Sequence, residues 1–169
     1  MARITLKGTP FNTCGELPER GTIAPEFTLV GLDLAPSHLS QFSGKKVLNV
    51  FPSLDTPVCA LSVRAFNERA AGKPGVTVLN VSADLPFAQK RFCGAEGIDR
   101  AVTLSCFRST FAKDYGLEIV DGPLQGLCSR AVIVLDERNQ VVYTEQVPEI
   151  AQEPDYEAAM KAVRKALGI

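Results

Sequence analysis

Cysteine is the residue type in this sequence best suited to chemistry, and one of its five cysteines has a distinctive setting. Cys59 closes the stretch FPSLDTPVC, in which Thr56 and Pro57 come shortly before it. Thr is favoured as a helix N-cap and Pro at the first helical position, so we expect Cys59 in the first turn of a helix. The N–H groups and dipole there favour an anion, and the thiolate is the nucleophilic form of cysteine. The pattern predicts a reactive thiol that faces solvent at the head of its helix.

The same residues also allow a purely structural interpretation of Cys59. Together with Val63, Phe66 and Ala70 it follows helical spacing along one face, and buried cysteines commonly act as small apolar side chains. Asp55 does not help as a base, because a nearby carboxylate opposes thiolate formation, so we expect it in a turn or cap. The residues alone therefore leave burial and reactivity both open for Cys59.

The remaining cysteines and the single histidine give no support to a metal site. An odd number of cysteines cannot all pair within one chain, and no CxxC motif occurs. The only histidine, His38, lies in a Pro- and Ser-containing segment and is expected at the surface, so a closed Cys/His zinc site is not predicted. We therefore expect neither a metal nor a cofactor.

Length and composition indicate one globular domain over residues 1–169. The net charge of −1 and the hydrophobic share of 46% give no electrostatic footprint for nucleic acid or for an acidic membrane surface. The apolar runs are too short to span a bilayer, and residues 1–21 lack the apolar core of a signal peptide. We expect a cytoplasmic protein.

Apolar runs and turn residues predict the elements that position these side chains. Strands are expected at 4–6, 11–13, 27–30, 46–51, 76–81, 102–104, 131–135 and 141–146, with 7–10 as the turn of an N-terminal β-hairpin. Helices are expected at 57–71, at 85–93 with Asp84 as N-cap and Gly94 as its end, at 109–115 and at 154–167. This order predicts an α/β protein with a mixed central sheet flanked by helices, for which a thioredoxin-like fold is the nearest common architecture.

Several separated motifs resemble one known family. Pro52, Thr56 and Cys59 reproduce the PxxxTxxC signature of peroxiredoxins. The stretches SADLPF at 82–87, RFCGAEG at 91–97, DGPL at 121–124 and SRAV at 129–132 are similar to thiol peroxidases, the atypical two-cysteine subgroup. The resemblance runs nearly end to end, which is far more specific than the signature alone.

The resemblance implies roles for four residues around the peroxide. Cys59 would be the peroxidatic cysteine, Thr56 would orient the peroxide and Pro52 would shield the thiolate. Arg130 would activate both the sulfur and the peroxide. From the residues alone, Thr56 is equally a helix cap, Pro52 a strand stop and Arg130 a surface charge.

Cys93, within RFCGAEG, matches the resolving cysteine of thiol peroxidases. It would condense with the Cys59 sulfenic acid to form an intramolecular disulfide, which requires local unwinding of one or both helices. The structural alternative is a buried filler beside Phe92. The resemblance further implies thioredoxin as reductant and a homodimer. Cys14, Cys106 and Cys128 have no place in the family pattern, and we expect small buried or surface thiols, with Cys128 near enough to Arg130 in sequence to line the pocket.

The residues leave other functions open. The leading hypothesis is a peroxidase acting on hydrogen peroxide and organic hydroperoxides. A thiol–disulfide oxidoreductase is weakened because Thr56 stands where its first cysteine would be. A redox sensor would use oxidation of Cys59 as a signal without turnover. A holdase-like oligomer would not use Cys59 at all.

Overall fold

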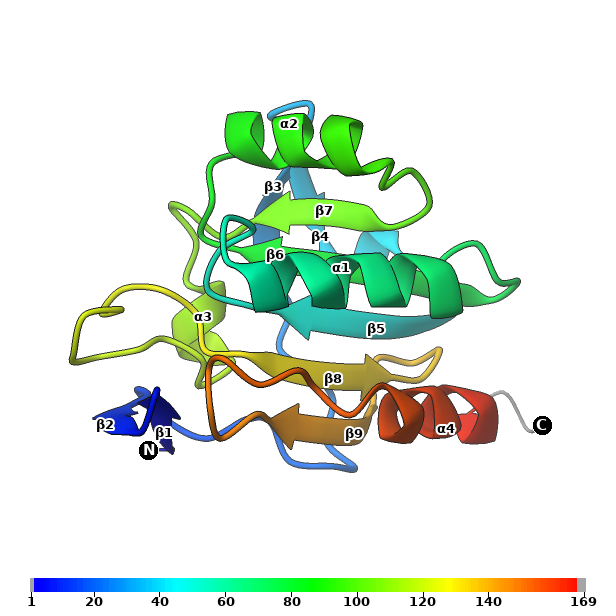
Figure 1. The fold of residues 1–169 in the computed structure, drawn as a ribbon. Helices are drawn as coiled ribbons and strands as arrows, with labels where there is room; N and C mark the ends of the chain where they lie inside the picture. The colour runs from blue at the N-terminus through cyan, green and yellow to red at the C-terminus, as the bar shows by residue number, and fades with distance from the viewer. Residues whose placement is uncertain (1, 167–169) are drawn as a thin grey trace.

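A seven-stranded mixed sheet forms the centre of the computed structural model, which describes residues 2–166, in the order β4-β3-β7-β6-β5-β8-β9 (Figure 1). The strands are β3 (Thr28–Gly31), β4 (Pro36–His38), β5 (Lys45–Val50), β6 (Val76–Ser82), β7 (Val102–Ser105), β8 (Ala131–Leu135) and β9 (Val141–Gln146). The helices are α1 (Pro57–Arg69), α2 (Pro86–Glu96), α3 (Phe111–Asp114) and α4 (Tyr156–Ala166). The predicted mixed sheet flanked by helices is therefore confirmed.

The central strands are those with continuous apolar sequence. β5 is buried along its whole length and pairs in parallel with β6, while β8 joins its other edge in antiparallel orientation. In this register Val50 lies opposite Val81 on one side and Ala131 on the other. The carboxyl ends of β5 and β6 and the start of β8 thus lie side by side at the same end of the sheet. Functional sites of α/β proteins commonly lie at the carboxyl ends of the strands.

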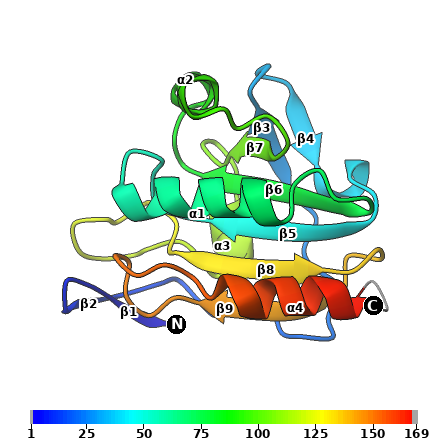
Figure 2. The same cartoon turned by 45° about the vertical axis from the view of Figure 1, so that its right-hand side comes forward.

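Helices cover the two faces of the sheet unequally (Figures 1 and 2). α1 and α4 pack on one face, where Phe66 and Met160 lie in an apolar cluster with Val47 and Val132 of the sheet. α2 lies on the same side, packed against β7. The opposite face is covered by α3 and by loops, with Leu48 and Ile133 contributing from the sheet. Because side chains of a strand alternate between faces, the two clusters are separated by the sheet itself.

The N-terminal hairpin is confirmed with a tighter turn than predicted. β1 (Arg3–Leu6) pairs with β2 (Thr9–Asn12), so only Lys7 and Gly8 form the turn. Both have positive φ, 50° and 84°, which is the conformation of a two-residue turn whose twist matches the strands.

Three expectations about local structure need correction. α2 begins after Leu85 rather than after Asp84, and it continues through Gly94 to Glu96, ending at Gly97 with φ 67°. His38 belongs to β4 and is half-buried, with its ring nitrogen 3.0 Å from the Thr28 hydroxyl, so it is not a solvated loop residue. This strand was missed because three residues beginning with proline give no strand pattern.

The closing helix is confirmed as α4, with Tyr156 half-buried and Met160 and Val163 buried. Leu167, predicted on the same side, lies outside the described residues. No helix within residues 2–166 is both long enough and apolar enough to cross a membrane.

Candidate active site

Thr56 sets the start of α1 and thereby the place of Cys59. Its backbone is extended, and its hydroxyl oxygen accepts a hydrogen bond from the Cys59 N–H at 3.4 Å. The same hydroxyl donates to the Ser53 carbonyl at 3.1 Å, and Pro57 is the first helical residue. The sequence prediction of a Thr cap followed by Pro is confirmed, and Cys59 lies in the first turn.

The Cys59 side chain does not face solvent, so that expectation was wrong. Its exposed fraction is 0%, and it belongs to an apolar cluster with Phe51, Leu54 and Val63. The reason is the helical spacing already visible in the sequence, since the side of α1 that carries Cys59 and Val63 also carries Phe66 and packs on the sheet. The sequence left burial and reactivity of Cys59 as alternatives. If Cys59 is reactive, it is so as a buried residue.

Arg130 contacts the sulfur directly. Although it is an arginine, it is only 1% exposed, and its Nη2 donates to Cys59 Sγ at 3.1 Å. Its Nε donates to the Ile150 carbonyl at 2.8 Å, which fixes the plane of the guanidinium. Its Nη1 is buried and has no hydrogen-bond partner among the described residues. The interpretation of Arg130 as a surface charge is excluded.

Strand pairing explains why Arg130 reaches this position. Ala131, the first residue of β8, pairs with Val50, the last residue of β5, so Arg130 lies beside the end of β5. Alternation along β8 turns Arg130 to the same face as Val132, which is the face covered by α1. A charged donor on a buried sulfur favours negative charge there, because hydrogen bonds with an ionised partner are stronger than neutral ones.

Cys93 lies in α2 and is 8% exposed, within the same apolar cluster as Cys59. Its sulfur is 3.3 Å from the Thr103 hydroxyl of β7, and burial raises the pKa of the Cys93 thiol. Both cysteines are free thiols. The structure thus brings together Cys59, Thr56, Arg130 and Cys93, while Pro52 is buried at the start of the loop that leads to Cys59.

The other three cysteines are not part of this cluster. Cys14 is exposed, and Cys106 and Cys128 are buried in the apolar cluster on the opposite face of the sheet. Cys128 does not line the pocket beside Arg130, because its side chain packs in the apolar cluster on the opposite face of the sheet.

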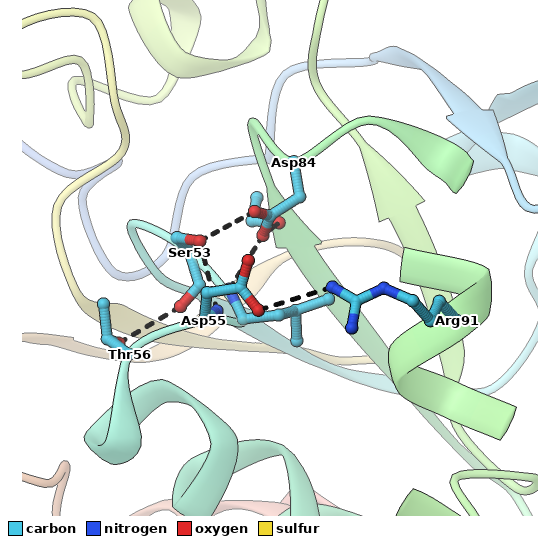
Figure 3. Close-up of polar contacts among 7 residues, drawn as sticks. Ser53, Asp55, Thr56, Asp84 and Arg91 are labelled. Carbon is cyan, nitrogen blue, oxygen red and sulfur yellow. Dashed lines mark hydrogen bonds and ion pairs between the residues drawn. The ribbon is translucent and has the colours of Figure 1, made fainter. Parts of the chain in front are cut away.

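Asp84 is a positioning residue that the sequence analysis assigned to another role. Its carboxylate accepts hydrogen bonds from the Ser53 hydroxyl at 2.7 Å, the Leu54 N–H at 2.8 Å and the Ser82 hydroxyl at 2.6 Å (Figure 3). Asp84 therefore ties the loop before Cys59 to the end of β6. Its place directly after a buried parallel strand next to β5 was the signal that could have revealed this role.

An exposed ion pair also joins this loop to α2. Asp55 and Arg91 approach to 3.7 Å, and both side chains are about 70% exposed, at 73% and 70% (Figure 3). Exposed pairs of this kind contribute little to stability. The prediction that Asp55 lies in a turn is confirmed.

A separate hollow of about 660 Å³ lies between β9 and α4 and contains none of these residues. Its lining includes Arg20, Lys161 and Lys165 but no cysteine. Cys59 and Arg130 lie elsewhere, and their hydrogen bond marks the candidate active site.

The chain is similar in sequence and in fold to several known proteins. The Redoxin family model matches residues 19–160. A thiol peroxidase of Mycobacterium tuberculosis (strain ATCC 25618 / H37Rv) is 60% identical over 164 residues, covering 96% of this chain and 99% of the relative. The crystal structure of a peroxiredoxin-like protein from Aquifex aeolicus has a TM-score of 0.93 at 39% identity, covering 98% of both chains. A thiol peroxidase from Chromobacterium violaceum, at 24% identity and a TM-score of 0.87 over 98% of this chain and 97% of the other, shares the fold.

We expect Asp84→Asn to destabilise the loop before Cys59. The amide cannot accept from the Leu54 N–H and both hydroxyls as the carboxylate does, so the free energy of unfolding should fall by about 1–3 kcal/mol. Peroxide oxidation of Cys59 should slow, because the residues that set its helix start lose their anchor. Denaturant unfolding and stopped-flow oxidation measure the two effects.

Asp55→Asn is the matched control, since it removes one carboxylate from the same loop but only an exposed ion pair. Its free energy of unfolding should change by less than about 1 kcal/mol. Equal effects of the two substitutions would contradict the role given to Asp84.

Proposed function

Since the chain belongs to the redoxin family and is a thiol-dependent peroxidase, we propose that Cys59 is the residue that attacks the peroxide. The observation that carries this proposal is the 3.1 Å hydrogen bond from the buried Arg130 guanidinium to Cys59 Sγ. Among the described residues 2–166, Cys59 is the one cysteine whose sulfur accepts a hydrogen bond from an arginine. Thioredoxin-like architecture with the nucleophile at a strand–helix junction is the setting expected of such an enzyme.

In the proposed reaction the Cys59 thiolate attacks one oxygen of the peroxide. The O–O bond breaks, the other oxygen leaves as hydroxide or alkoxide, and Cys59 becomes a sulfenic acid. Acidity alone does not make this step fast, because a more acidic thiol is intrinsically a weaker nucleophile. The site must also stabilise the charge that develops on the leaving oxygen.

Arg130 and Thr56 supply suitable groups for that purpose. The buried Nη1 of Arg130, unpaired among the described residues, is a donor for the peroxide oxygen. The Thr56 hydroxyl already donates to a carbonyl and accepts from one N–H, and its second lone pair can accept the peroxide O–H. We also propose that Pro52, which is buried, shields the sulfur from water, as the family resemblance implies.

Peroxide entry requires movement, because Cys59 is fully buried in the described conformation. Leu54, which is 4% exposed, shares the buried cluster with Cys59, and the partly buried Ala60 packs against that cluster. We propose that the loop before α1 and the first turn of the helix open together. The loop is tied to the end of β6 by the hydrogen bonds of Asp84, which can be released without breaking the central sheet, so we expect it to open locally.

We further propose that Cys93 resolves the sulfenic acid as an intramolecular disulfide. Its shared apolar cluster with Cys59 supports this role, and so does its raised pKa, which keeps it a thiol until it reacts. A disulfide requires Cα atoms within about 7 Å, so we expect α2 to unwind at its C-terminal end. Gly94 in the last turn and Gly97 at the cap weaken that end.

The remaining steps and the setting of the enzyme are proposals that rest on the family. The disulfide would be reduced by thioredoxin, the chain would form a homodimer, and the enzyme would act in the cytoplasm as one domain over residues 1–169. A thioredoxin-coupled assay with hydrogen peroxide and an organic hydroperoxide tests the reductant and the substrate together. Sedimentation equilibrium tests the dimer.

Arg130→Met should reduce the rate of Cys59 oxidation by about 10²–10³-fold, the usual cost of losing one charge-stabilising donor. Methionine keeps much of the volume, so the loss of rate should exceed the loss of stability. Stopped-flow kinetics and denaturant unfolding measure these quantities. Arg138→Met, which changes an exposed arginine in the β8–β9 turn, is the control, and near-normal kinetics in Arg130→Met would refute the role of Arg130.

Cys59→Ser should abolish peroxide consumption, whereas Cys93→Ser should retain a single turnover. The serine at 59 lacks the nucleophilic sulfur, while the variant at 93 forms the sulfenic acid but cannot resolve it. Peroxide consumed per chain, with and without a thioredoxin system, separates the two. Sustained turnover by Cys93→Ser with thioredoxin would contradict the resolving role, and sustained turnover by Cys59→Ser would contradict the whole assignment.

A further inference from the structure

A second pair of cysteines lies on the other side of the sheet from Cys59. The sulfurs of Cys106 and Cys128 are 3.5 Å apart, although the residues are separated by 22 positions in the chain. Cys106 is 7% exposed and Cys128 is 0% exposed, and both are free thiols. Neither residue takes part in the proposed peroxidase reaction.

The backbones of both cysteines are held in place by neighbouring elements. Cys106 is the first residue after β7, and its N–H donates to the carbonyl of Ser82 at the end of β6. Cys128 forms a β-bridge with Glu118, and the following Ser129 N–H donates to the Leu117 carbonyl. The short sulfur–sulfur distance is therefore a product of the fold, and it links the loop after β7 with the segment that leads into β8.

The two thiols are chemically different. The hydrogen bond between the two sulfurs lowers the pKa of Cys106, whereas the same bond and full burial raise the pKa of Cys128. Burial of Cys106 and the negative charges of Asp84 and Glu118 raise its pKa, as smaller effects. Cys106, with the lowered pKa and the greater exposure, is the member of the pair better placed to meet a peroxide.

We propose that Cys106 and Cys128 form a second redox-active dithiol, which a hydroperoxide oxidises to an intramolecular disulfide separate from the one between Cys59 and Cys93. The Cys106 thiolate attacks one peroxide oxygen and the O–O bond breaks. The other oxygen leaves as hydroxide or alkoxide and takes up the proton that the Cys106 thiol had released, which gives water or an alcohol. The Cys106 sulfenic acid then reacts with the Cys128 thiol, the S–S bond forms, and the sulfenic oxygen leaves as water. Two thiols lose two electrons and one peroxide is reduced.

The geometry requires only a modest movement for this bond. A disulfide has an S–S distance of about 2.05 Å, so the two sulfurs must approach by roughly 1.5 Å. The pair cannot resolve Cys59 instead, because its side chains lie in the cluster on the opposite face of the sheet. The fully reduced chain therefore holds two dithiols and is expected to reduce two peroxides before it needs a reductant.

The test uses the double variant Cys59→Ser/Cys93→Ser, so that its outcome does not depend on the role of Cys59. The reduced protein is treated with hydrogen peroxide, alkylated and digested with trypsin without reduction. Cleavage after Arg100, Arg108, Lys113 and Arg130 places the two cysteines in separate peptides, 101–108 and 114–130. Mass spectrometry should find these peptides joined, and adding Cys106→Ala or Cys128→Ala should abolish the linked species.

Cys14→Ser in the same background is the control, because it removes an exposed thiol and should leave the linked peptides unchanged. Unmodified Cys106 and Cys128 after a peroxide dose that fully oxidises Cys59 in the wild type would overturn the proposal. So would Cys106 recovered as a sulfinic acid with Cys128 still a thiol. Peptide mapping of the oxidised wild type gives the same decision if the double variant fails to fold, and peroxide consumed per reduced chain should fall from two equivalents to one in Cys106→Ala.

Discussion

The site depends on one buried interaction, the hydrogen bond from the Arg130 guanidinium to the Cys59 sulfur. A cation withdrawn from water needs strong acceptors, and here it has the Ile150 carbonyl on one side and the sulfur on the other. Negative charge on the sulfur satisfies this requirement better than a neutral thiol does. The pairing of β8 with β5 sets the arginine beside the end of β5, so the most regular part of the fold carries the charge that the chemistry uses.

The two partners are held in different ways. Arg130 is fixed by the central sheet and by the Ile150 carbonyl, while Cys59 belongs to a helix start held by the Thr56 cap and by the bonds of Asp84 to the preceding loop. A sealed sulfur is protected from water, but the peroxide must still enter and Cys93 must still reach it. A rigid donor combined with a releasable nucleophile reconciles these demands, because the loop can open without disturbing the guanidinium.

Local signals in the sequence predicted most of the helices and strands, although β4 was missed, and they did not predict the contacts between distant residues. Thr56 followed by Pro57 correctly placed the helix start, since a cap is decided by neighbouring residues. The burial of Cys59 was mispredicted because a residue in the first helical turn can face either the sheet or solvent. Arg130 was found only through the family resemblance, since its partner lies 71 positions away, and Asp84 was misassigned because its partners include an N–H 30 positions earlier.

The most direct test of the central interaction is the ultraviolet absorbance of the thiolate in the reduced protein at neutral pH. The thiolate signal of Cys59 is the difference between the wild type and Cys59→Ser, which cancels the other four cysteines. We expect that difference to be largely lost when the same comparison is made in an Arg130→Met background that retains its circular dichroism. A difference of equal size in both backgrounds would show that the sulfur holds its charge without the guanidinium, and would contradict the account.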